Sequence, residues 1–597
     1  MSKPSYLFEV SYEVCNKVGG IYSLLRSKSH HMTDQYGESY FAIGPYVKEK
    51  ADLEFQERPP SGKLSEVIDG LVPDGIKCHY GRWMTESRPN AILIDYSGYR
   101  SRANDIKKEL WEFAEVDSLF ADEWFNDPLI WSTTAGILLD RIAESEEKGK
   151  NQVAQFHEWL SGGGLLKTKE LESEIATVFT THATVLGRAL AGYGEPVHEI
   201  VEAPADKEKN LELAREHKVL GKHTMELASA KHADVFTTVS EVTGKEAEHF
   251  LGRKPDILVP GGIDLDKYPS MDEITIKRRA NRRHMRNFLM AYFGRYYHID
   301  LYNIRSMFIS GRYEFHNKGI DLFIDALGRL NERMKKEKTK RKVVSFLWIP
   351  SGVRGEDFQV LKNKSVYEEI KDRIDELIPE VEEEIIHSIT EGGTPKHVFD
   401  QDIMQELRNI GQHFADKRGE NPPLCAFELA YPQEQDQIIQ AFRKNGLLNR
   451  EEDCVKVIYY PAYLSPTDGL ISLEYNQATM TCDIGVFPSY YEPWGYTPLE
   501  TAALGGLAIT TDLAGFGKFI EGKGKGIYVL KRQNRSMEDA VEDLTDKLYE
   551  VVNMPKEELS EEKISARKLS ALADWRHFIK NYYSAYEKAL TQKKKAR

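Results

Sequence analysis

Two glutamates, Glu492 and Glu500, lie in an aromatic, glycine-containing stretch that follows an apolar run and leads into a helix-like pattern. Glu492 falls at the end of the predicted strand. Carboxylates in such a loop can accept hydrogen bonds from sugar hydroxyls, while N–H groups of the loop and of a helix N-terminus meet phosphate oxygens. Thr497 followed by Pro498 predicts a helix N-cap, and Glu500 then completes a capping box as its structural role.

A second loop carries two cations, Arg312 and Lys318, directly after the apolar run 307–311. Loops at the carboxyl ends of parallel strands bind ligands in doubly wound sheets, and two cations there suit a diphosphate. An ordinary charged surface loop explains the same residues equally well.

A third loop contains Lys17, Gly19 and Gly20 between the apolar run 6–10 and a helix-like pattern. Glycines at a strand-to-helix turn let backbone N–H groups approach a phosphate, and Lys17 adds a cation. The pair alone is weak evidence, because tight turns use glycine too. The loop is neither a Walker loop nor a complete G-x-G-x-x-G.

Composition limits the class of protein. The 597 residues hold 80 Lys and Arg against 94 Asp and Glu, a net charge of −14, which argues against a dedicated nucleic-acid binder. We find no run of the roughly 18 apolar residues that a membrane helix needs, and no signal-peptide core. The five cysteines form no CxxC pair, so we expect a reduced, cytoplasmic protein without nucleic-acid or membrane partners.

The elements that position these loops are short runs that are apolar throughout and separated by helical patterns, as in strands buried on both faces of a parallel sheet. Two successive sets predict two doubly wound α/β domains. The runs are 6–10, 40–44, 91–96, 176–183, 235–240 and 257–260, then 307–311, 343–350, 455–460, 484–488 and 507–511.

We expect a first domain with its linker at 1–300, a second at 301–565, and a C-terminal helix at 566–597 that crosses back to the first. A mostly helical insertion, about 356–445, interrupts the second domain, and Pro379 should kink or split its first helix. The insertion either caps the domain or makes a subunit contact, and the cap is slightly favoured. A basic run at 277–286 is best explained as a solvated helix face; a contact with an acidic partner or a neighbouring subunit is the alternative.

The sequence SYYEPWGYTPLE at 489–500 resembles that of the glycogen synthases of the animal and fungal type, which are retaining glycosyltransferases with the GT-B fold. NKVGGIYSLLRSK (16–28), QFHEWLSG (155–162), THATVLGR (181–188), SGRYEFHNKG (310–319), TDLAGFGKF (511–519) and ADWRHFIKNYY (573–583) resemble that family in the same order. The resemblance therefore spans nearly the whole chain. It implies transfer of glucose from UDP-glucose to the non-reducing end of an α-1,4-glucan, with no cofactor.

The resemblance also assigns roles at the matching positions. The catalytic set is Glu492, His182, Lys318 and Arg312. The donor would be held by Lys17, Gly19, Gly20, Arg188, Arg312, Lys318, Tyr475, Gly495, Tyr496, Thr497 and Glu500. In this scheme Glu500 binds the ribose and Tyr475 stacks on the base, whether uracil or adenine. His157 and Glu158 would line the cleft near the acceptor, although a lone strand-end histidine is more often structural.

No metal is expected. Asp264 and Asp266 formally make the Asp-x-Asp pair that many glycosyltransferases use, but they follow two glycines in a linker, so we interpret them as turn residues. Fixed cations then replace the metal, and retention without an obvious nucleophile implies front-face attack.

The chain departs from the family in one region. The family's arginine-rich helix, which binds glucose 6-phosphate, corresponds here to 563–569, with Arg567 as its one arginine. Forked guanidinium groups suit phosphate, so we expect no activation by that effector. The resemblance also favours a homo-oligomer, with a tetramer preferred. Another retaining transferase that makes a disaccharide or a small glucoside, or a catalytically silent glucan-binding protein, remains the alternative.

Overall fold

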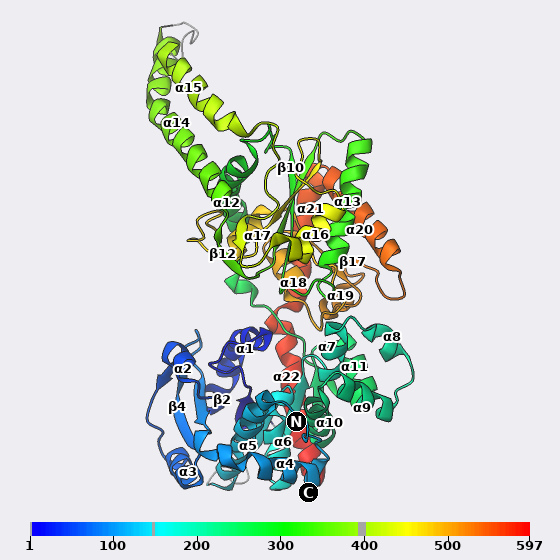
Figure 1. Ribbon diagram of the computed structural model, residues 1–597. Helices are drawn as coiled ribbons and strands as arrows, with labels where there is room; N and C mark the ends of the chain where they lie inside the picture. Colours follow the sequence, from blue (N-terminus) through cyan, green and yellow to red (C-terminus); the bar gives the residue numbers. More distant parts are fainter. Residues whose placement is uncertain (1–2, 146–149, 392–400, 597) are drawn as a thin grey trace.

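The computed structural model describes residues 3–145, 150–391 and 401–596. It has two lobes, each built around a mainly parallel sheet and flanked by helices, which stand one above the other in Figure 1. The predicted fold class, two doubly wound α/β domains of the GT-B kind, is confirmed by this architecture.

The sheet of the second lobe is parallel throughout, and six of its strands lie in the described residues, in the order β14-β11-β10-β15-β16-β17. The order reverses between β10 and β15, and such a switch point is where doubly wound sheets bind ligands. The bounds are β10 (Ile304–Ser310), β11 (Lys342–Trp348), β14 (Val455–Tyr459), β15 (Ile484–Val486), β16 (Leu507–Thr511) and β17 (Ile527–Leu530).

The first lobe has the strand order β3-β4-β5-β2-β1-β6-β7-β8-β9 within the described ranges, with antiparallel pairing only at β3 and β4. Its switch point lies between β1 and β6. The bounds are β1 (Tyr6–Val10), β2 (Tyr40–Pro45), β3 (Phe55–Glu57), β4 (Lys77–Trp83), β5 (Asn90–Asp95), β6 (Gln152–His157), β7 (Ala176–Thr181), β8 (Val235–Thr238) and β9 (Ile257–Leu258).

The sequence patterns missed strand β6, which lies at the centre of this sheet. Two glutamines interrupt its apolar run, yet every residue of the strand is buried. Burial of Gln155 is tolerated because its side-chain amide donates to Thr180 Oγ1 at 2.8 Å and its side-chain carbonyl accepts from Tyr586 Oη at 2.6 Å. A buried amide with partners is tolerated in a core, but the partners lie far away in sequence.

The chain crosses between the lobes twice, along neighbouring paths. The linker after β9 pairs with the segment before helix α22 (Trp575–Ala596): Ile263 N–H donates to the Ala573 carbonyl at 3.0 Å, and Trp575 N–H donates to the Ile263 carbonyl at 2.9 Å. Helix α22 then runs back into the first lobe (Figure 1). Its residues Tyr582 and Tyr586 are buried there.

Helix α12 (Met271–Phe293) belongs by its packing to the second lobe, because Phe288 and Tyr292 lie in the core around β10 and β11. We therefore propose that the second domain begins at α12 rather than at residue 301. The basic run on this helix is only partly a solvated face. Arg278 donates to the carbonyls of Met480 and Cys482 at 2.7 and 2.9 Å, and Arg282 pairs with Asp483 at 3.0 Å, whereas Lys277, Arg279 and Arg283 are exposed.

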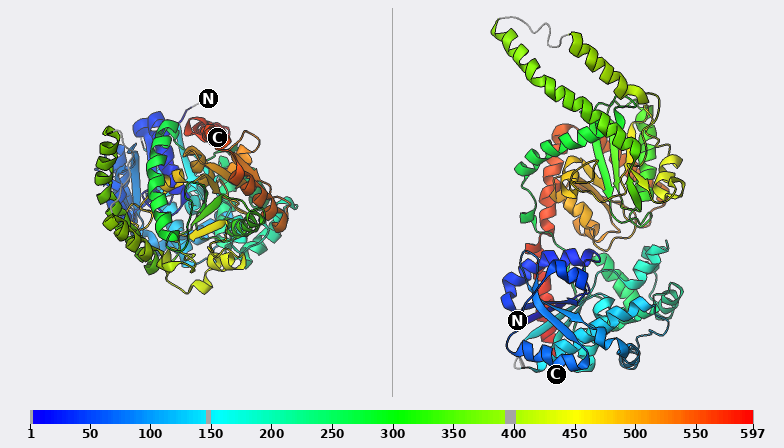
Figure 2. Two further views of the ribbon diagram at one scale, coloured as in Figure 1. Left: turned by 90° about the horizontal axis from the view of Figure 1, so that it is seen from above. Right: turned by 60° about the vertical axis from the view of Figure 1, so that its left-hand side comes forward.

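The helical insertion is an arm. Helices α14 (Phe358–Thr390) and α15 (Gln401–Phe414) extend away from both sheets, and a small antiparallel pair, β12 (Val353–Glu356) and β13 (Phe427–Leu429), lies at their base (Figures 1 and 2). The expected cap over the domain is therefore wrong. Pro379 lies inside α14 without splitting it.

Three further observations concern the chain as far as the structure describes it. No helix there is long and apolar enough to cross a membrane. No group of three or more His, Cys, Asp or Glu side chains there could hold a metal ion. The five cysteines are free and buried.

Candidate active site

The loop that carries Glu492 follows β15 and ends where helix α18 (Tyr496–Ala503) begins. The helix starts two residues earlier than the predicted N-cap Thr497 allows, because Gly495 is its N-cap, with φ 108° and no side-chain cap. The predicted capping box of Thr497 and Glu500 is therefore wrong. The left-handed φ requires glycine, and a Cβ there would also lie 3.2 Å from Glu492 Cγ.

Glu492 forms an ion pair with Lys318, whose Nζ lies 2.5 Å from Oε2. Their loops are held together by the Asn317 carbonyl, which accepts from Tyr490 N–H at 2.8 Å and Tyr491 N–H at 3.2 Å. Gly319, with φ 67°, then begins helix α13 (Ile320–Lys336). A predicted cation and a predicted carboxylate thus meet at the switch point between β10 and β15.

Arg312 stays outside this pair. Its guanidinium is 73% exposed and lies 2.8 Å from Glu314 of the same loop. The structure therefore places Arg312 in the loop after β10, with its guanidinium group pointing into solvent.

Three further donor-site residues gather beside this loop. Tyr475, at the start of helix α17 (Tyr475–Thr481), shares a hydrogen bond of 2.9 Å with Ser310 Oγ at the end of β10. Burial raises the pKa of Glu500 to about 7, and its carboxyl group lies within electrostatic reach of Tyr475 and Tyr496. Tyr496 packs against Gly261 of the linker, where a Cβ would come within 2.0 Å of Tyr496 Oη.

The glycine loop of the first lobe differs from the expected phosphate cradle. Lys17, Gly19 and Gly20 are exposed, but the carboxylate of Glu13 accepts from Gly19 N–H at 2.7 Å and from Tyr22 N–H at 2.9 Å. Burial raises the pKa of Glu13, and these N–H groups oppose the rise. The chain's own carboxylate therefore occupies the N-terminus of helix α1 (Gly20–Tyr36), which favours anions.

The two predicted histidines contact each other, with His157 Nδ1 2.9 Å from His182 Nε2. His157 Nε2 lies 2.9 Å from Glu9 Oε1. Burial lowers the pKa of both histidines, and in His182 the neighbouring His157, Lys28 and Arg188 lower it further. Both imidazoles are therefore neutral near pH 7.

Glu158 lies within electrostatic reach of Arg188 and holds the turn that carries His182. Glu158 Oε1 accepts from the N–H groups of His182 at 2.9 Å and Ala183 at 3.1 Å, which fixes the turn after β7. Glu158 and His157 are only 4% and 1% exposed. Both side chains hold other groups in place, and the expected contacts with the acceptor stay a prediction. Arg188 is exposed, within electrostatic reach of Glu158 on its own lobe and Tyr491 on the other.

Contacts across the lobes add residues that the sequence patterns missed. Tyr491 Oη donates to Glu246 Oε2 at 3.0 Å, and Thr184 Oγ1 donates to the same oxygen at 2.8 Å. His198 Nε2 lies 2.8 Å from the Tyr490 carbonyl. These partners are tens to hundreds of residues apart and share no motif, so no local signal marks them.

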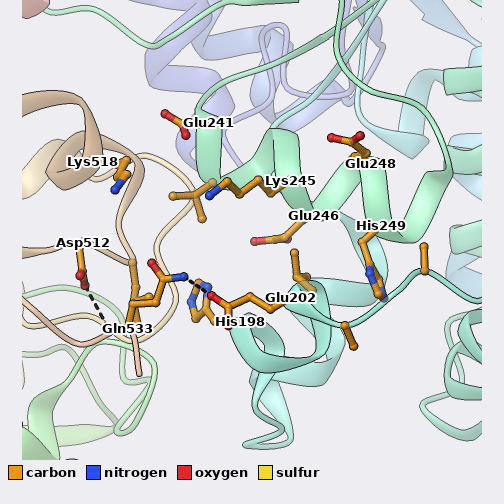
Figure 3. Close-up of a pocket in the computed structure, with 15 residues that line it drawn as sticks. His198, Glu202, Glu241, Lys245, Glu246, Glu248, His249, Asp512, Lys518 and Gln533 are labelled. Carbon is orange, nitrogen blue, oxygen red and sulfur yellow. Dashed lines mark hydrogen bonds between the residues drawn. The ribbon is translucent and has the colours of Figure 1, made fainter. Parts of the chain in front are cut away.

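A cavity of about 460 Å³ opens beside these contacts (Figure 3). Helices α8 (Val197–Glu202) and α11 (Glu241–Leu251) form one wall, and the segment around α19 (Gly515–Ile520) forms the other. None of the predicted site residues lines it. Its labelled side chains are His198, Glu202, Glu241, Lys245, Glu246, Glu248, His249, Asp512, Lys518 and Gln533.

The match to a known protein family covers nearly the whole chain and does not depend on one motif. The family model described as Glycogen synthase matches residues 9–596. The chain belongs to the glycogen synthase family. Liver glycogen [starch] synthase of Mus musculus is 34% identical over 595 residues, which cover 98% of this chain and 83% of that protein. Glycogen [starch] synthase of Caenorhabditis elegans is 35% identical, covering 96% of this chain and 86% of that one.

Among solved structures, the catalytic domain of starch synthase IV from Arabidopsis thaliana, bound to ADP and acarbose, superposes with a TM-score of 0.51 at 14% identity. It covers 98% of this chain and 100% of that domain, and it supports the fold alone. A glycogen synthase is a glycosyltransferase, so the predicted enzyme class is confirmed.

Proposed function

We propose that the protein transfers glucose from UDP-glucose to the non-reducing end of an α-1,4-glucan, with retention at the anomeric carbon and without a metal ion. The observation that carries this proposal is the Lys318–Glu492 pair at the switch point of the second sheet. A cation for a diphosphate and a carboxylate for sugar hydroxyls stand side by side where doubly wound sheets bind ligands.

In the proposed reaction, Lys318 and Arg312 take up the negative charge of the departing diphosphate. The bond between the glucose C1 and the phosphate oxygen breaks, and the acceptor O4 bonds to C1 on the same face. The O4 proton passes to the leaving phosphate oxygen. Glu492 accepts hydrogen bonds from the sugar hydroxyls, and preorganised charges of this kind stabilise an oxocarbenium-like transition state.

Glu492 is ill suited to act as a covalent nucleophile. Its Oε2 is engaged by Lys318 at 2.5 Å. A carboxylate held in an ion pair is a weaker nucleophile than a free one, because bond formation must also break the pair. This supports front-face departure and attack.

Activation by glucose 6-phosphate is not part of the proposal. Lys563 is buried and donates to Asp483 Oδ1 at 2.7 Å. Arg567 donates to the backbone carbonyls of Ala503 and Pro269. Of the three cations in this stretch, Lys568 is the exposed one. Cations already committed to protein partners support a helix that does not recognise a phosphate.

We further propose a homo-oligomer, with a tetramer favoured by the family resemblance. Helix α14 of the arm exposes isoleucines on its distal half: Ile378 is 50%, Ile386 55% and Ile389 64% exposed. Exposed apolar side chains clustered on one projecting element indicate a contact with another chain. The five buried, free cysteines support a cytoplasmic setting.

The test is incorporation of labelled glucose into glycogen from UDP-glucose and, separately, from ADP-glucose, with and without a chelator. We expect incorporation that survives chelation. Glu492→Gln should abolish it while leaving the thermal unfolding midpoint near that of the wild type. Absence of incorporation from both donors would remove the proposal, and transfer to free glucose instead of glycogen would favour a disaccharide-forming enzyme.

A further inference from the structure

A buried ion pair lies in the first lobe, next to His157. Lys28 of α1 and Glu9 of β1 are 0% and 1% exposed, and Lys28 Nζ donates to Glu9 Oε1. The same carboxylate accepts from Tyr40 Oη, and its Oε1 lies 2.9 Å from His157 Nε2. Burial alone raises the pKa of Glu9, but the charge of Lys28 and the bond to His157 lower it to about 2.

The C-terminal helix completes the surroundings of Lys28. The ammonium group lies 4.4 Å from the centre of the Tyr582 ring and 3.2 Å from Gln155 Oε1. Tyr586 Oη donates to the same Gln155 oxygen at 2.6 Å. Replacing a buried ion pair by apolar residues of the same size is often neutral or stabilising, so this pair is weak evidence for a role in stability.

The pair dictates where the protons of the two histidines lie. Anionic Glu9 can only accept, so neutral His157 carries its proton on Nε2. His157 Nδ1 is then an acceptor, and the 2.9 Å contact requires a proton on His182 Nε2. His182 Nδ1 is left with a lone pair. No hydrogen bond to that nitrogen occurs within the part of the chain that the structure describes.

We propose that Lys28 and Glu9 are positioning residues that hold His182 in its Nε2–H tautomer, with Nδ1 as the acceptor for a hydroxyl of the donor sugar. The last clause rests on the proposed function, whereas the tautomer does not. Without Lys28, buried Glu9 would take up a proton and become a donor to His157 Nε2. Both hydrogen bonds would reverse, and His182 would carry its proton on Nδ1.

The experiment records long-range proton–nitrogen NMR spectra of the full-length protein labelled with 15N-histidine. His157→Asn and His182→Asn assign the two signals. We expect the Nε2–H tautomer for both residues in the wild type. Lys28→Met should convert His182 to the Nδ1–H tautomer.

Kinetics provide the second readout. Lys28→Met should lower kcat by about 100-fold, the cost of a misaligned group, with KM for UDP-glucose changed by less than about threefold. The double variant Glu9→Gln/Lys28→Met, in which a neutral amide oxygen can accept from His157, should restore the tautomer and most of kcat. Lys456→Met is the matched control, because Lys456 is also buried and lies 4.2 Å from the Tyr297 ring, in the second lobe.

The outcomes separate the two proposals. A wild-type His182 proton on Nδ1, or the same loss of kcat in Lys456→Met as in Lys28→Met, overturns the inference. If the protein shows the expected tautomers but transfers no glucose, the proposed function is overturned and the tautomer assignment stands. If Lys28→Met does not fold, the wild-type spectrum and the double variant decide.

Discussion

Under the proposed function, Lys318 has two competing partners, Glu492 in the free enzyme and the diphosphate in the donor complex. Removing Lys318 and removing Glu492 should therefore change the affinity for UDP in opposite directions. Lys318→Ala removes the cation that we assign to the diphosphate. Glu492→Gln releases that cation from its present partner, from which it lies 2.5 Å away.

The magnitudes follow from the exposure of the pair. Two unit charges 4 Å apart interact by about 4 kcal/mol at an effective dielectric of 20, but Lys318 and Glu492 are 16% and 20% exposed, so solvent screens part of this. A hydrogen bond to a charged group contributes about 1.5–3 kcal/mol. Lys318→Ala should thus raise the Kd for UDP by about 10- to 100-fold. Glu492→Gln should lower it by about two- to fivefold, the value of about 0.5–1 kcal/mol for a solvent-screened pair.

The assay is isothermal titration of the protein with UDP, which lacks the transferred glucose, so contacts with that sugar do not contribute to the measured Kd. Lys169→Ala is the matched control, because Lys169 and Asp234 form a pair of 2.7 Å and similar exposure, 14% and 10%, away from the site. It should leave the Kd unchanged. A Kd that rises in both Lys318→Ala and Glu492→Gln, or in neither, would refute the assignment of Lys318 to the diphosphate.

Three further outcomes are expected. Burial raises the pKa of Glu500 to about 7 from about 4.5 when unfolded, so its ionisation costs stability as pH rises through that window. Glu500→Gln should therefore raise the free energy of unfolding by up to about 3 kcal/mol at pH 8, and Tm with it, and should leave both unchanged at pH 4. An equal gain at both pH values would contradict this. Glucose 6-phosphate should leave the rate of glucose incorporation unchanged; a several-fold stimulation would refute the account of Lys563 and Arg567. Glu substitutions at Ile386 and Ile389 should lower the molar mass measured by light scattering without loss of helix content, and an unchanged mass would exclude the arm as the subunit contact.

Local pattern predicted the fold well, because strands buried on both faces of a parallel sheet must be apolar along their length. It failed where a polar residue is buried with remote partners, as Gln155 is in β6. It also failed at the start of α18, where Thr497 is a good N-cap by type. Gly495, with its left-handed φ, is the N-cap instead, and its backbone conformation is set by how the loop packs.

The sequence located the loops that carry the candidate residues, but it did not predict the contacts that those residues make. Lys318 and Glu492 lie in the two loops that the sequence indicated, and they meet. Gly19 was predicted to face phosphate, but Glu13 already accepts its N–H. His157 was predicted to line the cleft near the acceptor, and its ring lies buried between Glu9 and His182.

Sequence alone determined that the chain forms two doubly wound domains, and which loops carry cations, carboxylates and glycines, since residue type and periodicity are local properties. The tertiary structure decided the pairings: Glu492 meets a lysine 174 positions away, and Glu9 a histidine 148 positions away. Burial makes an unpaired charge costly, so each buried group must find a partner. Which partner it finds depends on where the whole chain places the groups, and spacing along the sequence does not contain that information.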